Sequence, residues 1–454
     1  MNHGKKIRFG RFGLAGASIV AIVASNSAFA DDVAPSFAAQ GAAIPGSATP
    51  EALASGAGAN QSYGIPYGSW MLYPSIFVGG VFNSNVYQTQ ANQTAAGGAR
   101  LTPNIEADLD NGLHKTTVYA NVDAQLYPGA TSKLGQTATT VSGRVGLAHI
   151  WSPTSDIVAR FSVDYTRQDG PFGATLATSV PIGSATAFVG APVALNANGF
   201  RQFSNQTTVL ASVEKTLTGQ TFVRVGVGAQ QLIYEAAPRG YFGGQNGIDS
   251  NAFVRGGFWV TPLVNVFVET GGDLRRYYGS SFYDANSYRA IAGLASDMIG
   301  LVRGQIYGGL QQQFSTQGTF RDLTKPALGF SLTYYPLEYL TIAASLSNSF
   351  GAPGSSSPNA VVSANNETWQ ARLQADYALF EYWRASVRAG YTDTLYTSNS
   401  TSSRAWLAGA GFSYNLWRNV ALTVDYQFTR TNSLGVSATS YSQNLATAGV
   451  TYRY

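Results

Sequence analysis

The residues of this chain that could do chemistry are charged side chains placed at every second position of apolar segments. Arg160 and Asp164, for example, share a segment with Phe161, Val163 and Tyr165. Such alternation gives a β-strand two different faces, and a charge facing lipid is costly, so the charged face must meet water. The chemistry that this pattern predicts is electrostatic: a wet passage whose walls attract, repel or orient solutes.

The predicted lining of this passage consists of the charged residues that share the polar face of their segments. They are Glu106, Asp108, Asp123, Arg160, Asp164, Glu269, Asp273, Arg275, Arg303, Arg372, Asp376, Arg384, Arg388 and Asp425. Acidic residues gather in the segments around 106–123, with Asp110 among them, and arginines gather around 372–388. One interpretation is an acidic wall facing a basic one, which would create a transverse field. The other is that any wet face collects both signs, with Asp376 neutralising its arginine neighbours.

Catalytic candidates are few. His114 and His149 are predicted near strand ends, and neither has a second ligand at metal spacing. Each is better explained as an interfacial side chain than as a catalytic base. The sequence contains no phosphate-binding glycine loop, no nucleophile elbow and no metal-binding cluster. It therefore predicts no enzyme, no catalytic residue, no cofactor and no metal.

The elements that must position the charges are β-strands, and the pattern is clearest at the end of the chain. Val420, Leu422, Val424, Tyr426 and Phe428 alternate with small or polar residues. A polar tip is predicted from 431 to 440, and a closing strand then runs to the last residue. Aromatic residues on the lipid face are typical of membrane barrels, whose last strand pairs with the first. The predicted interface aromatics and assembly signal are Tyr452, Tyr454, Trp383, Tyr426 and Phe428.

From Tyr73 onward, short turns alternate with longer polar connections. The predicted short turns are at 110–112, 152–154, 217–219, 261–263, 297–300, 336–338, 379–381 and 416–418. These eight turns and nine longer connections give about eighteen strands, with sixteen as the alternative, in an up-and-down antiparallel barrel with periplasmic turns. A propeller also has a period near forty residues, but its strands are shorter than the segments 118–127, 157–166 and 340–350.

The predicted domain organisation is a signal peptide at 1–30, a disordered periplasmic tail at 31–70 and a barrel at 71–454. Four basic residues precede an apolar run that is too short for a membrane anchor, and cleavage is expected before Asp31. The tail is rich in Ala, Gly, Ser and Pro, so it is interpreted as a spacer rather than a docking peptide. The absence of cysteine excludes a disulfide scaffold and a lipid anchor on cysteine.

Composition supports a membrane barrel. Charged residues make up only 11% of the chain and aromatic residues 13%, and the chain after residue 30 has no apolar run long enough for a spanning helix. Without the signal peptide the chain carries 24 basic and 24 acidic residues, so nothing in its charge predicts nucleic-acid binding.

The connection at 170–200 is the longest and contains no charged residue. It is expected either to fold into the barrel as a constriction or to lie over the mouth. Tyr119, Phe253, Trp259 and Tyr307 are predicted to face inward, either as stacking surfaces for sugars or as space-filling side chains.

The segment Val78-Gly79-Gly80-Val81-Phe82-Asn83-Ser84-Asn85-Val86-Tyr87, followed by units such as 334–340, resembles the putative beta-barrel porin type 2 family over residues 70–454. The resemblance implies an integral barrel in the outer membrane of Gram-negative bacteria, in contact with outer-membrane lipid and lipopolysaccharide and inserted by the barrel assembly machinery. It also implies an association with exopolysaccharide export beside a periplasmic export protein. Residues 31–70 are too few to supply the helical repeats of larger secretion barrels, so such a partner would be a separate protein.

Three classes of function are known to use a barrel of this kind. The first is a passive conduit, either for polysaccharide export or for diffusion of small solutes. The second is a structural or adhesive barrel with a plugged lumen and partner-binding loops. The third, a lipid hydrolase, needs a nucleophile and a base on one barrel face, and the sequence shows no such pair.

Overall fold

The computed structural model describes residues 64–131, 137–171, 201–235, 246–278, 284–299, 301–318, 321–337, 339–350, 366–378, 382–396, 401–434 and 440–454. All regular structure in these ranges is β. The strands are β1 Ile65–Tyr67, β2 Trp70–Asn83, β3 Ala96–Asp110, β4 His114–Leu126, β5 Thr140–Thr154, β6 Ile157–Pro171, β7 Arg201–Thr218, β8 Thr221–Glu235, β9 Gly247–Thr261, β10 Val264–Tyr277, β11 Ala285–Ile299, β12 Val302–Ser315, β13 Leu323–Leu337, β14 Leu340–Phe350, β15 Asn366–Ala378, β16 Trp383–Tyr396, β17 Thr401–Trp417, β18 Val420–Leu434 and β19 Ser440–Arg453.

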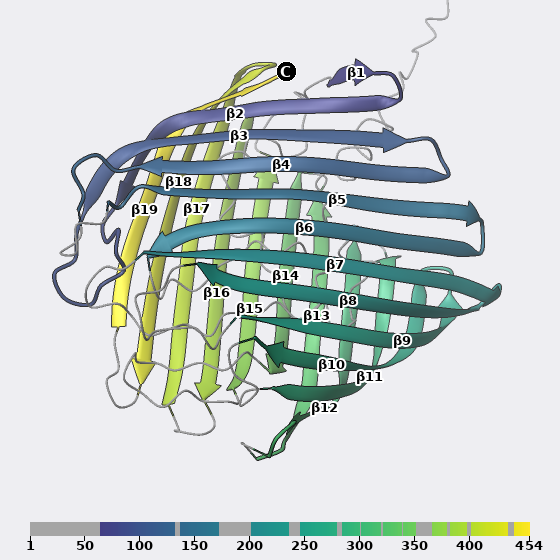
Figure 1. The fold of residues 1–454 in the computed structure, drawn as a ribbon. Helices are drawn as coiled ribbons and strands as arrows, with labels where there is room; N and C mark the ends of the chain where they lie inside the picture. Colours follow the sequence, from purple (N-terminus) through teal and green to yellow (C-terminus); the bar gives the residue numbers. More distant parts are fainter. Residues whose placement is uncertain are drawn as a thin grey trace, which may run out of the picture.

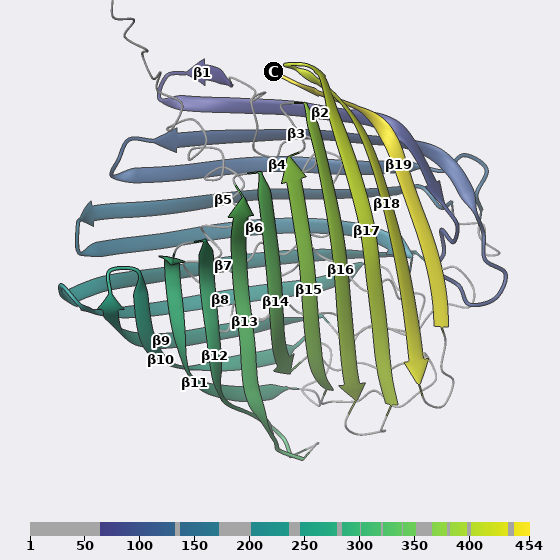
Figure 2. The same ribbon diagram turned by 180° about the vertical axis from the view of Figure 1, so that it is seen from behind.

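The strands form one closed antiparallel barrel. The sheet has nineteen strands, of which β1 only extends the start of β2, and the other eighteen pair in sequence order until β19 returns to β2. The predicted eighteen-stranded up-and-down barrel is therefore confirmed. In Figure 1, β2–β9 run across the strands of the opposite wall, and Figure 2 shows the same crossing from behind. Such crossing is expected because the strands of a barrel tilt relative to its axis.

Each wall has an apolar outer face and a polar inner face. In β9 and β10, Val254 and Val268 are 47% and 63% exposed, whereas their neighbours Arg255 and Glu269 are 5% and 1% exposed. The period-two pattern produces this contrast, because successive side chains of a strand point to opposite sides. Strands of 11 to 18 residues are long enough to cross a bilayer at a tilt.

The short connections that the structure describes in full lie at one end of the barrel, here called the short-turn end; they are 111–113, 155–156, 219–220, 262–263 and 418–419. The amide of Tyr454 donates to the carbonyl of Pro74 at 3.2 Å, so the C-terminus also lies there, beside the start of β2. The turn after β3 shows its local cause: Gly112 has φ +85° and its amide donates to Asp110 Oδ1 at 2.9 Å.

Several predicted boundaries differ from the structure. The strand β18 continues to Leu434 through part of the predicted tip, and residues 152–154 belong to β5, whose turn follows them. The short strand β1 lies inside the predicted tail, so ordered structure begins before residue 71. The predicted turn positions 300, 338 and 379–381 lie outside the described residues, as do the signal peptide and nearly all of the tail.

The motif Asn83-Ser84-Asn85 joins β2 to β19 at the end opposite the short turns. Asn85 is fully buried, and its side chain accepts from the Thr89 amide at 3.0 Å and donates to the Thr89 carbonyl at 2.8 Å. Ser84 Oγ accepts from the amide of Asn444 at 2.8 Å. The motif therefore stabilises the pairing of β19 with β2 that closes the barrel, because it bonds the connection after β2 to β19.

Candidate functional site

The candidate site is the polar inner wall, and side chains that reach across a whole strand identify the concave side. Tyr119 of β4 donates its hydroxyl to Asp164 of β6 at 2.6 Å, passing over Gly146 of β5. Any Cβ at residue 146 would collide with the tyrosine ring. Side chains on the inside of a closed barrel converge, so contacts across an intervening strand form there between buried groups such as Asp164.

A second contact of this kind crosses β17. Arg388 of β16 donates through both Nη atoms to the carboxylate of Asp425 of β18, at 2.8 Å each, and its guanidinium lies over Gly409. Paired hydrogen bonds of this type fix both partners. Arg388 is 1% exposed, so its charge is balanced inside the wall rather than offered to solutes.

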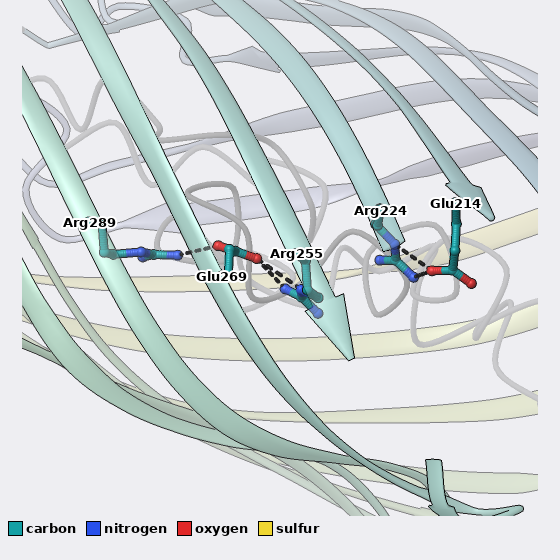
Figure 3. A network of polar contacts seen from close by, with 5 residues as sticks. All are labelled: Glu214, Arg224, Arg255, Glu269 and Arg289. Carbon is teal, nitrogen blue, oxygen red and sulfur yellow. Dashed lines mark hydrogen bonds and ion pairs between the residues drawn. The ribbon is translucent and has the colours of Figure 1, made fainter. Parts of the chain in front are cut away.

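A charged belt crosses five adjacent strands, from β7 to β11 (Figure 3). Arg224 donates to Glu214 at 2.6 Å, and Arg255 and Arg289 donate to the two oxygens of Glu269 at 2.6 and 3.2 Å. The register explains the belt, since Glu214 pairs with Arg224, Arg224 with Arg255 and Arg255 with Glu269. Three arginines and two glutamates leave one net positive charge there.

Other inner-wall charges are also paired. Arg275 donates to Asp249 at 2.9 Å, and Asp273 accepts from Ser287 at 2.9 Å. Three more ion pairs of this wall are Arg144 with Asp164 at 2.6 Å, Arg100 with Asp123 at 2.7 Å, and Lys325 with Glu367 at 3.0 Å. A buried ion pair fixes the positions of its two side chains. It adds little to the free energy of unfolding, because each ion has lost its hydration.

The predicted acidic group is partly neutralised. Asp123 binds Arg100 and Asp110 binds Lys115, which leaves Glu106 and Asp108 of β3 without an ion pair in the described part of the chain. Asp108 instead accepts from Thr117 at 2.6 Å.

The acidic and basic groups do not lie on opposite walls. Going around the ring, only β17, β18, β19 and β2 separate β16 from β3, whereas opposite strands of eighteen have eight strands between them. The two groups are therefore sectors of one side of the barrel.

The other predicted lining residues lie on the same polar face. Arg160 and Asp164 are buried in β6, Arg303 is half-buried in β12, and Asp376 of β15 accepts from Gln374 at 2.8 Å. Among the described residues, the Arg372 side chain donates one hydrogen bond, to Gln370 Oε1 at 3.4 Å. The connection at 170–200 lies almost wholly outside the described residues, so its position relative to the lumen stays a prediction.

The inner aromatic residues mostly cover glycines. Phe253 lies over Gly226, and Tyr307 lies over Gly329, and both rings are 6% exposed. These two rings therefore offer little surface for stacking. Trp259 is half-buried and packs against Phe222 at 6.0 Å between ring centroids.

The predicted interface aromatics lie on the outer face. Tyr452 and Tyr454 are 47% and 54% exposed, Trp383 and Tyr426 are also exposed, and Phe428 is half-buried. This placement fits an anchor at the membrane interface, and their role in assembly stays a prediction.

Sequence reasoning missed the pairing of the two histidines. His114 Nδ1 and His149 Nε2 lie 3.4 Å apart on the outer face, His149 Nδ1 is 2.8 Å from Thr116 Oγ1, and His114 stacks on Trp151. Strands β4 and β5 bring them together from 35 residues apart. Beside them is a groove of about 570 Å³, lined mainly by Ala, Val and Phe side chains of β6–β8. The described residues contain no group of three potential metal ligands.

No helix in the described ranges is long and apolar enough to cross a membrane. Solved structures with a similar arrangement include the FrpB iron transporter from Neisseria meningitidis (F3-3 variant), with 7% identity, TM-score 0.41 and coverage of 84% of this chain and 81% of that chain. Another is the siderophore receptor PirA from Pseudomonas aeruginosa, with 9% identity, TM-score 0.37 and coverage of 84% and 80%. The anion-selective porin from Comamonas acidovorans has 12% identity, TM-score 0.35 and coverage of 85% and 99%. These similarities are too low to carry an argument about function.

The search of curated proteins found no match. The family model described as "Putative beta-barrel porin 2" matches residues 59–454, which include the whole barrel and the Asn-Ser-Asn motif. This match confirms the resemblance inferred from the sequence. The chain belongs to the putative beta-barrel porin 2 family and is a porin-like outer-membrane β-barrel.

Proposed function

We propose that this barrel is a passive conduit of the outer membrane, for export of a polysaccharide or for diffusion of small solutes. The observation that carries the proposal is the closed ring of eighteen strands with a continuous polar inner face. A barrel of this strand number is too wide for its own inward side chains to fill. The chemistry of the wall is electrostatic, and no catalytic step is part of the proposal.

A second candidate, a plugged barrel whose external loops bind a partner, is favoured by one observation. Glu269, Arg289 and Arg388 are only 1–2% exposed, although a wide water-filled channel would leave such side chains accessible. Single-channel recording in planar bilayers separates the two. Reproducible conductance steps support the conduit, and their absence, with correctly folded barrel in the membrane, supports the plugged barrel.

Polymer and small-solute transport differ in their need for a partner. If the barrel exports a polymer, a separate periplasmic export protein delivers the polymer to it. Deletion of the gene would then abolish surface polysaccharide while leaving uptake of small solutes unchanged. Unchanged surface polysaccharide with reduced uptake of small solutes would support a diffusion porin.

A further inference from the structure

Two arginines at the short-turn end differ from the paired charges elsewhere in the wall. Arg384 is the second residue of β16, and Arg453 is the last residue of β19. Both lie on the inner face, and their guanidinium groups are within electrostatic range of one another. We call these two residues the arginine pair. In the proposed orientation they lie at the periplasmic mouth of the barrel.

The arginine pair has few protein partners. Arg453 is 8% exposed, and within the described part of the chain its side chain donates one long hydrogen bond, of 3.5 Å, to Asn415 Oδ1. Nε of Arg453 and Nη1 of Arg384 are buried and have no acceptor among the described residues. Asp376 is within electrostatic range of Arg384, but its carboxylate accepts from Gln374 and forms no ion pair with another described residue.

The register shows what is missing beside Arg384. Arg388 pairs with Gly409, Gly409 pairs with Gln427, and Asp425, two residues before Gln427, neutralises Arg388. The same path from Arg384 leads through Ser413 and Thr423 to Ala421. The methyl group of Ala421 therefore occupies the position beside Arg384 that the carboxylate of Asp425 occupies beside Arg388.

The hydroxyl groups around this position are also without partners. Thr423 Oγ1 and Thr451 Oγ1 are buried and have no hydrogen-bond partner in the described structure. Residues 421 and 451 pair directly, so both hydroxyls lie next to the alanine. Buried donors without acceptors are costly, and an oxyanion would satisfy several of them together.

We propose that Arg384 and Arg453 form a binding site for an oxyanion group, a carboxylate or a phosphate, carried by a solute at the short-turn mouth of the barrel. The guanidinium fork suits both groups, and Asn415, Thr423 and Thr451 add neutral donors. The solute's passage rests on the proposed conduit, whereas its binding does not.

The test uses the whole mature barrel in detergent and two anionic probes, tripolyphosphate and tri-galacturonate, with neutral maltotriose as a blank. Each anionic probe is expected to raise the thermal unfolding midpoint of the wild type, and maltotriose is not. Arg384→Gln with Arg453→Gln should weaken binding by at least about tenfold, because two charged donors are lost. A response to only one probe would identify phosphate or carboxylate as the preferred group and would still support the site.

Two further variants keep the test decisive if the double variant folds poorly. The matched control, Arg388→Gln with Asp425→Asn, removes the ion pair between β16 and β18 without changing net charge, and it should retain binding. Ala421→Asp places a carboxylate beside Arg384 in the position that Asp425 has beside Arg388. This variant should abolish binding while leaving the barrel folded.

Three results would overturn the inference: no shift with either anion, retained binding in both the double variant and Ala421→Asp, or equal loss in the matched control. Conductance of the same preparations tests the conduit separately. A thermal shift without conductance would overturn the conduit and keep the binding site. Conductance without any thermal shift would support the conduit and overturn the binding site.

Discussion

At the scale of single residues, the inner wall is governed by which charges have partners. Many carboxylates of the described wall are bound by an arginine on the adjacent strand or two strands away, so those charges cancel over short distances. The charges without a counter-ion carry the local field, because a paired charge contributes little at a distance.

The Arg388–Asp425 pair predicts a large and asymmetric effect on stability. Asp425→Asn leaves a buried guanidinium unpaired and should destabilise the barrel by about 3 kcal/mol. Adding Arg388→Gln should recover much of this loss, since no buried charge then remains. Urea unfolding of the barrel in lipid vesicles, followed by tryptophan fluorescence, measures both. Equal destabilisation by the single and double variants would contradict the pairing.

A second prediction at this scale concerns the glycine beneath Tyr119. Gly146→Ala forces the tyrosine ring away from Asp164, and such overpacking should cost about 1–3 kcal/mol. Gly256→Ala is the matched control, because no atom lies within 4 Å of its added Cβ. It should change the free energy of unfolding by less than about 0.5 kcal/mol. The same unfolding assay applies, and equal effects would refute the close approach.

At the scale of elements, the seam between β19 and β2 determines whether the barrel closes. Tyr452 pairs with Val420 on one side and Ile76 on the other, and Arg453 pairs with Ser75. The last residues therefore supply both the final ladder hydrogen bonds and the outer aromatic side chains.

Deleting residues 452–454 should sharply reduce the amount of folded barrel in the outer membrane. Tyr452→Phe with Tyr454→Phe is the control, since it keeps the rings and the backbone, and it should assemble normally. Heat-modifiable mobility of the membrane fraction on gels reports the folded form. Normal assembly of the deletion variant would show that the closing strand is dispensable.

At the scale of the whole molecule, ion selectivity should follow the unneutralised charges of the lumen. Replacing Arg372, Arg384 and Arg388 by Gln removes two arginines that have no ion pair among the described residues and leaves Asp425 without its counter-ion, so the permeability ratio should shift toward cations. The neutral double variant Arg388→Gln with Asp425→Asn should stay near the wild type. Reversal potential in a salt gradient measures the ratio. An unchanged value in the triple variant would place these arginines off the conducting path.

The sequence by itself was enough to predict the barrel. Alternation of Val254, Arg255 and Gly256, or of Val424, Asp425 and Tyr426, is local, and it assigns each side chain to a face without knowledge of its neighbours. The short turns are also local signals, so their number in the sequence predicts the number of strands. Strand ends were less certain, as β18 and β1 show, because a polar residue can end a strand or extend it.

Only the tertiary structure decided which charges are paired. The bond between Arg388 and Asp425 crosses an intervening strand, and it depends on the register of two hairpins and on a glycine between them. His114 and His149 likewise meet only through the pairing of β4 with β5. Register and strand tilt are properties of the closed ring, and no single segment encodes them. The sequence therefore determined which residues face the lumen, and the fold determined which of their charges remain available to a solute.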